Sequence, residues 1–103
     1  TQRFYNRALG LQGPAPEVCS PLIAEKIVEQ HLQSDAMLVI LPWQDWMAMD
    51  KKLANKNPHA ERINVPADPR NFWCYRMHLT LEQLLTEKKF NTKVKKMVKE
   101  SGR

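Results

Sequence analysis

The sequence predicts a mainly α-helical fold with one short buried strand. Most apolar residues recur at helical spacing, whereas residues 37–41 form an uninterrupted apolar run of the kind found in strands that are covered on both faces. No second run of this quality is present, although a parallel strand needs neighbouring strands. This isolated strand, together with the absence of an initiating methionine, leads us to expect a fragment of a longer protein.

Length and composition narrow the class of protein. With 103 residues, of which 43% are hydrophobic and 26% are charged, the chain resembles one ordinary globular domain and not a disordered segment. Its longest apolar run, residues 36–41, is far shorter than the roughly 20 residues of a membrane span. The first ten residues lack the residue order of a secretory signal. We therefore predict a cytoplasmic protein without a membrane partner.

Cysteines and histidines give no sign of a metal site. Cys19 and Cys74 stand far apart and neither belongs to a CxxC pair, which favours a reducing compartment. His31, His59 and His78 are equally scattered along the chain. We predict that the protein uses neither a metal nor another cofactor.

The net charge of +5 is concentrated at one end of the chain. Residues 87–103 hold seven basic and two acidic side chains, whereas residues 1–86 hold nine of each. A nucleic-acid-binding domain usually carries its basic patch on the body of the domain. We therefore predict no nucleic-acid partner and interpret the lysines as the solvated face of a terminal helix.

The first third of the chain is predicted to hold two helical segments. Residues 1–11 have the spacing of a helix end, and the glycine and prolines of residues 13–16 then break it. Ser20 followed by Pro21 predicts a helix start, because the serine oxygen can accept an unpaired backbone N–H and proline has none to lose. This helix is expected to end within residues 33–35. Its predicted buried stripe consists of Ala24, Ile27, Val28 and His31.

The remaining elements follow the predicted strand. Pro42 stops the strand, residues 46–53 can form a short helix, and residues 54–71 are irregular. Thr80 and Gln83 have the spacing of a capping box, which predicts a helix start. Leucines of that helix are expected to face inward, namely Leu81, Leu84 and Leu85. The final helix is thin and amphipathic and is predicted to end at Gly102, with an apolar side of Val94, Met97 and Val98.

Gln44 and Asp45 are the first candidate site residues. They follow directly on the predicted strand, and function in barrels and open α/β sheets collects at the carboxyl ends of strands. The alternative is structural: Asp45 caps the next helix and Gln44 bonds a neighbouring loop.

Residues 61–76 form the second candidate site. Arg62 and Arg76 offer rigid donors, Asn64 offers both a donor and an acceptor, and Trp73 and Tyr75 offer flat faces. This mixture suits a ligand rich in hydroxyl groups. In the alternative interpretation the aromatic residues belong to the core, the arginines bridge to nearby acids and the prolines stiffen the loop. No catalytic pair of carboxylates and no activated nucleophile can be assembled from the sequence.

Three stretches of the sequence resemble a known protein family. They are "MLVILPWQDWMAMD", "ERINVPADPRNFWCYRM" and "LTLEQLL", in this order. Together they resemble the C-terminal end of the 4-alpha-glucanotransferases, the amylomaltase or disproportionating-enzyme family of the α-amylase clan, over about residues 19–86. The resemblance implies that residues 37–41 are the last strand of a (β/α)8 barrel. Residues 1–103 are then the C-terminal segment of that barrel, with residues 87–103 as a lysine-rich terminal helix.

The resemblance also implies a role for the irregular segment. In the family, an Arg-x-Asn-x-Pro-Gly loop lies at the catalytic face, near the bound glucan. Arg62, Asn64 and Pro66 match this motif, while Ala67 stands where glycine is usual. Trp73 matches the tryptophan of the family's Asn-Trp pair, and a phenylalanine replaces the asparagine. The three catalytic carboxylates of the family precede this segment, so none is assigned here, and no cofactor is implied.

The expected function is that of the parent enzyme. It would transfer α-1,4-glucan segments between maltodextrins by a retaining mechanism, with the glucan and the upstream barrel of the same chain as partners of this segment, which alone is expected to be inactive. The alternative is a free-standing, non-catalytic glycan- or protein-interaction module. Such a module would use Trp43, Trp46 and Trp73 to stack on glycans, or the lysines to meet an acidic partner.

Overall fold

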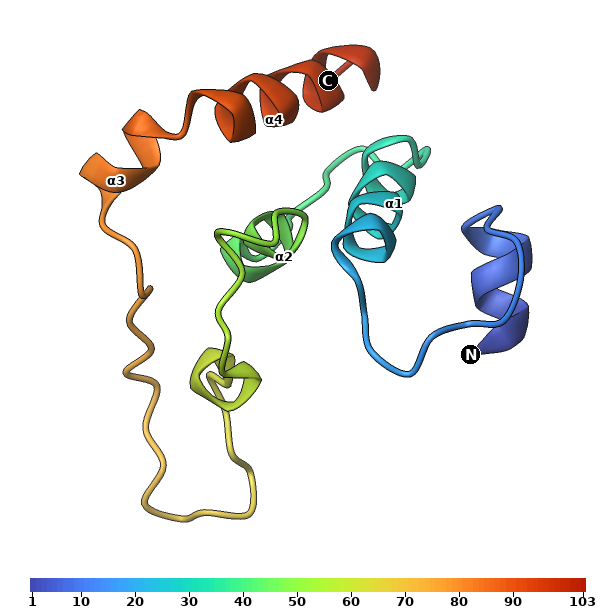
Figure 1. Ribbon diagram of the computed structural model, residues 1–103. Helices are drawn as coiled ribbons and strands as arrows, with labels where there is room; N and C mark the ends of the chain where they lie inside the picture. The colour runs from blue at the N-terminus through green and yellow to red at the C-terminus, as the bar shows by residue number, and fades with distance from the viewer.

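The structure is a computed structural model that describes residues 1–103, and it consists of helices and loops without a strand. The elements in order are η1 (Phe4–Ala8), α1 (Pro21–Leu32), α2 (Trp43–Ala48), η2 (Pro58–Glu61), α3 (Leu81–Thr86) and α4 (Lys88–Glu100). In Figure 1, α1, α2 and α4 surround one centre, while the chain between η2 and α3 runs away from them and back. The mainly helical prediction is confirmed. No helix has the combination of length and apolar character needed to cross a membrane.

The predicted buried strand is wrong for this chain. Residues 37–41 lack regular structure, and none of the backbone hydrogen bonds outside the helices involves them. No other segment offers a partner, and a segment alone cannot form the cross-strand hydrogen bonds of a sheet. Their exposure nevertheless alternates after Met37. Leu38 and Ile40 are 71% and 81% exposed, whereas Val39 and Leu41 are partly buried.

A small apolar core joins α1, α2 and α4. Its buried side chains are Ala24, Val28, Leu32, Met47, Met49, Leu53 and Phe90. Val94, Met97 and Val98 of α4 pack against this core, as predicted from their spacing. The rings of Trp43 and Phe90 meet edge to face, with centroids 6.2 Å apart, and so attach the start of α2 to α4.

Helix α1 begins where the sequence predicts. The Oγ of Ser20 accepts a hydrogen bond from the backbone N–H of Ile23 at 3.4 Å, and a proline occupies the first turn. The helix ends one residue before the predicted range. Its buried stripe consists of Ala24, Val28 and Leu32, so the prediction that His31 lies in the stripe is wrong. His31 is exposed, and its Nδ1 bonds the Ile27 carbonyl at 2.8 Å.

Helix α2 starts three residues before the predicted short helix. Pro42, with φ −62°, occupies the position before its first turn, where a fixed φ and the missing N–H do no harm. Gln44 and Asp45 therefore lie in the first turn of a helix, and no strand end precedes them.

Helices α3 and α4 are the last two elements of the chain. The capping box is present: Thr80 Oγ1 accepts from the Gln83 N–H at 3.2 Å, and Gln83 Oε1 accepts from the Thr80 N–H at 2.8 Å. Leu84 is buried as predicted, but Leu81 and Leu85 are 69% and 77% exposed, because nothing in the chain covers that side of α3. The chain turns at Gly102, whose φ of +76° suits the left-handed position after a helix.

Two basic side chains, Lys93 of α4 and Arg103 after it, tie the end of the chain to α1 and to the residues that follow α1. Lys93 Nζ lies 2.6 Å from Glu25 Oε2. The Arg103 guanidinium donates hydrogen bonds of 2.7, 2.6 and 2.8 Å to the carbonyls of Leu32, Ser34 and Ala36. Arg103 thus places a cation and three hydrogen bonds at the negative C-terminal end of α1.

Candidate functional site

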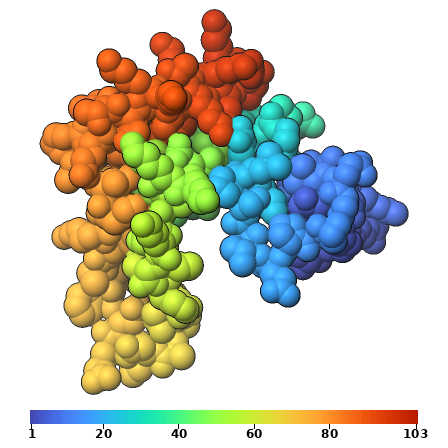
Figure 2. Space-filling view, viewed as in Figure 1, coloured from blue at the N-terminus to red at the C-terminus, as the bar shows by residue number.

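The segment from residue 62 to 76 is a long loop that projects from the helices. Figure 2 shows it as an arm, in yellow and light orange, standing clear of the rest of the molecule. Two consecutive turns form its tip: the Asp68 N–H donates to the Val65 carbonyl and the Asn71 N–H to the Asp68 carbonyl, both at 3.0 Å. Pro66 and Pro69 occupy the second position of each turn, where their fixed φ is favourable.

Ala67, which stands where the resembling motif has a glycine, fits the tip of this loop. No residue other than glycine has a positive φ in the structure, so Ala67 adopts an ordinary backbone conformation. An alanine therefore fits this turn without strain.

A side-chain hydrogen bond links the two limbs of the loop. Trp73 Nε1 donates to Asn64 Oδ1 at 3.2 Å. The indole of Trp73 is 75% exposed, and the neighbouring Phe72 is 74% exposed. The interpretation of Trp73 as a core residue is therefore wrong: its edge is held while its faces are open. Asn64, Pro66 and Arg62 are exposed as well.

The base of the loop is held by Glu61. Its carboxylate accepts hydrogen bonds from the Tyr75 hydroxyl at 2.8 Å and from Asn55 Nδ2 at 2.7 Å. His78 Nδ1 lies 3.5 Å from Glu61 Oε1, and His78 Nε2 lies 3.0 Å from the Leu53 carbonyl oxygen. Burial, followed by the hydrogen bond to Glu61, raises the pKa of Tyr75 to about 12. Glu61, at the end of η2, therefore joins the returning side of the loop to the segment after α2.

Gln44 and Asp45 face a different part of the surface. They line a cavity of about 770 Å³ between the residues that precede α1 and the residues around η2. The interpretation of Asp45 as a helix cap is not confirmed, since Pro42 precedes the first turn of α2 and no side chain makes a hydrogen bond there. Burial and then the charge of Asp45 raise the pKa of the Cys19 thiol, which lines the same cavity. Glu61 and Asn55 also line it, so the base of the loop borders this cavity.

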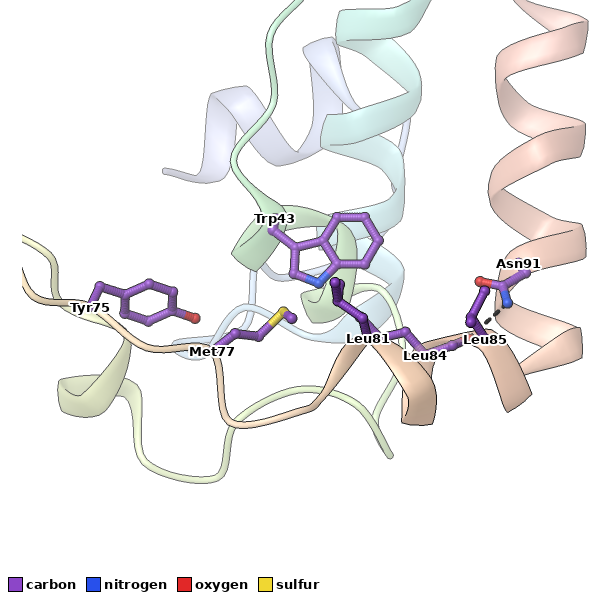
Figure 3. Close-up of a pocket in the computed structure, with 7 residues that line it drawn as sticks. All are labelled: Trp43, Tyr75, Met77, Leu81, Leu84, Leu85 and Asn91. Atoms are coloured by element: carbon purple, nitrogen blue, oxygen red, sulfur yellow. Dashed lines mark hydrogen bonds between the residues drawn. The ribbon is translucent and has the colours of Figure 1, made fainter.

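A second cavity, of about 690 Å³, is apolar. Figure 3 shows it between the start of α2 and α3, and its lining residues are Trp43, Tyr75, Met77, Leu81, Leu84, Leu85 and Asn91. The exposed leucines of α3 belong to this open groove. Asn91 Nδ2 donates to the Leu84 carbonyl at 2.8 Å and the Tyr75 hydroxyl donates to Glu61, so these polar lining groups already have partners.

The structure thus separates the predicted site residues into two groups. Asn64 and Trp73 are hydrogen bonded, with Arg62 and Pro66 on the same loop. Gln44 and Asp45 lie at the cavity beside the base of that loop. Glu61, which lies between the two groups, was not predicted as a site residue from the sequence. No three side chains of His, Cys, Asp or Glu gather where they could hold a metal ion.

Comparison with known proteins decides the family. A family model described as 4-alpha-glucanotransferase matches residues 1–81, which is most of the chain. The chain belongs to the 4-alpha-glucanotransferase family. The matched range contains the loop with Asn64 and Trp73, and both Gln44 and Asp45.

Two relatives are much longer than this chain. A protein named 4-alpha-glucanotransferase DPE2 from Oryza sativa subsp. japonica is 37% identical over 101 residues, which cover 98% of this chain and 11% of the relative. A 4-alpha-glucanotransferase from Chlamydia pneumoniae is 34% identical over 73 residues, which cover 70% of this chain and 14% of the relative. No solved structure matches the chain. The chain therefore corresponds to a small part of these members of the 4-alpha-glucanotransferase family.

Proposed function

We propose that this chain is the C-terminal part of a cytoplasmic 4-alpha-glucanotransferase that transfers α-1,4-glucan segments between maltodextrins by a retaining mechanism. The family match over residues 1–81 carries this proposal. Because the chain spans 11% and 14% of the two relatives, the activity is that of a full-length parent. This chain alone is expected to be inactive.

The reaction requires two carboxyl groups that we assign to the upstream part of the parent. One protonates the leaving glycosidic oxygen while the other, as a carboxylate, attacks the anomeric carbon, and the two lie about 5 Å apart in retaining enzymes. The glucosyl group then passes from the carboxylate to the 4-hydroxyl of an acceptor sugar, whose proton returns to the first group. The residues of this chain bind and orient the glucan.

The loop 62–76 is the proposed wall of the glucan cleft. The open faces of Trp73 suit the C–H faces of a sugar ring, and its indole is already held at the edge by Asn64. Asn64 Nδ2 makes no hydrogen bond within the chain, so it can donate to a sugar hydroxyl. Arg62 and Pro66 extend the same exposed surface. We assign Gln44 and Asp45, at the adjoining cavity, to the same cleft.

Residues 37–41 are proposed to join a sheet in the parent. Leu38 and Ile40 are exposed on one side of this segment, while Leu41 packs against the core. A strand between the helices and the interior of a (β/α)8 barrel has this division: one face is covered by helices and the other by the barrel interior. The upstream barrel of the same chain would supply that second cover and the missing hydrogen-bond partners.

Incubation of the full-length parent with maltotriose tests the function. Transfer predicts glucose together with maltodextrins longer than maltotriose, resolved by chromatography, and a slower reaction in a folded Asn64→Ala variant. An intact, folded parent that produces neither would remove the enzyme proposal. That result would favour the non-catalytic glycan-binding module, for which Trp73 is the largely exposed tryptophan.

A further inference from the structure

We propose that Glu61 is a positioning residue for glucan binding: its carboxylate ties the returning limb of the loop 62–76 to the end of η2, where the outgoing limb starts, and to the segment after α2, and thereby holds Asn64 and Trp73 ready for the sugar. This inference rests on the proposed glucan binding by the loop. Glu61 itself lies at the base of the loop, where it contacts protein side chains and not the open faces of Trp73.

Three chain segments meet at this one carboxylate. Asn55 comes from the segment after α2, Glu61 from the end of η2, and Tyr75 and His78 from the returning limb. The Glu61 side chain is only 19% exposed, so its oxygens depend on the Asn55 and Tyr75 donors in place of water. His78 is fixed at the same time, since its second ring nitrogen faces the Leu53 carbonyl at 3.0 Å.

The loop has little else to hold its limbs together. No backbone hydrogen bond joins the outgoing residues 62–65 to the returning residues 71–76. The links between the limbs are side-chain hydrogen bonds, Glu61 to Tyr75 at the base and Asn64 to Trp73 nearer the tip. Ordering a long loop only when a ligand arrives weakens binding, because the lost conformational entropy is then part of the binding free energy.

The electrostatics of Tyr75 agree with this geometry. Burial and the hydrogen bond to Glu61 raise the pKa of Tyr75 to about 12, so its hydroxyl remains a donor throughout the neutral range. The Tyr75 donor at the base of the loop is therefore kept wherever the enzyme would work.

The first experiment compares Glu61→Gln with Glu100→Gln in the full-length parent. Glutamine keeps the shape of the side chain but replaces one acceptor oxygen by a donor, so the donors of Asn55 and Tyr75 can no longer both be satisfied. We expect the KM for maltotriose to rise about ten-fold and kcat to change less than about two-fold, because a positioning residue acts on binding. Glu100→Gln removes the same charge at an exposed site of α4 and should leave both constants unchanged.

The second experiment needs no activity. The ionised fraction of Tyr75 at about pH 11 is measured as the tyrosinate absorbance lost in Tyr75→Phe, and a pKa of about 12 predicts about one tenth. A background of Glu61→Gln should give a clearly larger fraction, because two of the three causes of the shift, the hydrogen bond to Glu61 and its negative charge, are then weakened or lost.

The outcomes separate the two proposals. A parent that transfers no glucan overturns the proposed function and, with it, the role of Glu61 in binding. A parent that is active while Glu61→Gln and Glu100→Gln share the wild-type KM overturns the positioning role alone. An equal ionised fraction of Tyr75 with and without the Glu61 carboxylate would also overturn it, since the link at the base would then be absent.

Discussion

Replacement of Ile40 by alanine should have opposite consequences in two contexts. In this chain Ile40 is 81% exposed, so its truncation removes few contacts and should change the free energy of unfolding by less than about 0.5 kcal/mol. In a full-length parent with residues 37–41 in a sheet, the same side chain is buried. Full burial of an isoleucine side chain contributes about 1.5–3 kcal/mol. Because 81% of the Ile40 side chain is exposed in this chain, its burial in the parent would contribute about 1.2–2.4 kcal/mol.

The cavity left by the truncation adds to this loss, so we expect about 2–4 kcal/mol in the parent. Urea unfolding of wild type and variant, in this chain and in the parent, measures both values. Met47→Ala is the matched control, because Met47 is 1% exposed here and should lose about 2–5 kcal/mol in both contexts. An Ile40→Ala effect that stays below about 0.5 kcal/mol in the parent, with a normal control, would refute the strand assignment.

Three further predictions concern contacts within the chain. Thr80→Ala removes the capping box of α3 and should lower the free energy of unfolding by about 1 kcal/mol, whereas Thr92→Ala, at an exposed position of α4, should change it much less in the same urea titration. Arg103→Ala removes three hydrogen bonds at the end of α1 and should lower the free energy of unfolding by about 1.5 kcal/mol. An unchanged urea midpoint would contradict a stabilising role for Arg103. Because the pKa of Tyr75 is raised to about 12, its contribution to stability should be complete below about pH 10 and disappear as the pH rises through about 12. The difference in stability between wild type and Tyr75→Phe, followed by circular dichroism, should shrink over that window, and a difference that grows there would contradict the sign.

Local signals predicted the helices well. The Ser20–Pro21 start and the Thr80 capping box are decided by atoms within one turn, so the sequence alone is sufficient to find them. The strand failed for the opposite reason: hydrophobicity marks residues 37–41 for burial, but a strand exists only with partners that this chain does not hold. The prediction that the leucines of α3 face inward was wrong for Leu81 and Leu85 for the same reason. Their spacing is that of a buried face, but no other part of the chain lies opposite them.

The candidate site was predictable in composition and not in arrangement. The mixture of amide and aromatic side chains pointed to the loop, and the family resemblance pointed to Asn64 and Trp73 within it. Their mutual hydrogen bond spans nine residues of irregular chain and has no periodic signal. The contacts of Glu61 with Asn55 and Tyr75 are equally non-local, which is why the sequence did not predict its place at the base of the loop.

Hydrogen exchange on the full-length parent, with and without a long maltodextrin, tests the central claim that the loop 62–76 forms a wall of the glucan cleft. We predict slower exchange of the backbone amides in this loop when the glucan is bound, and unchanged exchange in α4, whose apolar side packs on the core. Equal exchange in the loop in both states, at a glucan concentration that saturates the parent, would contradict the account.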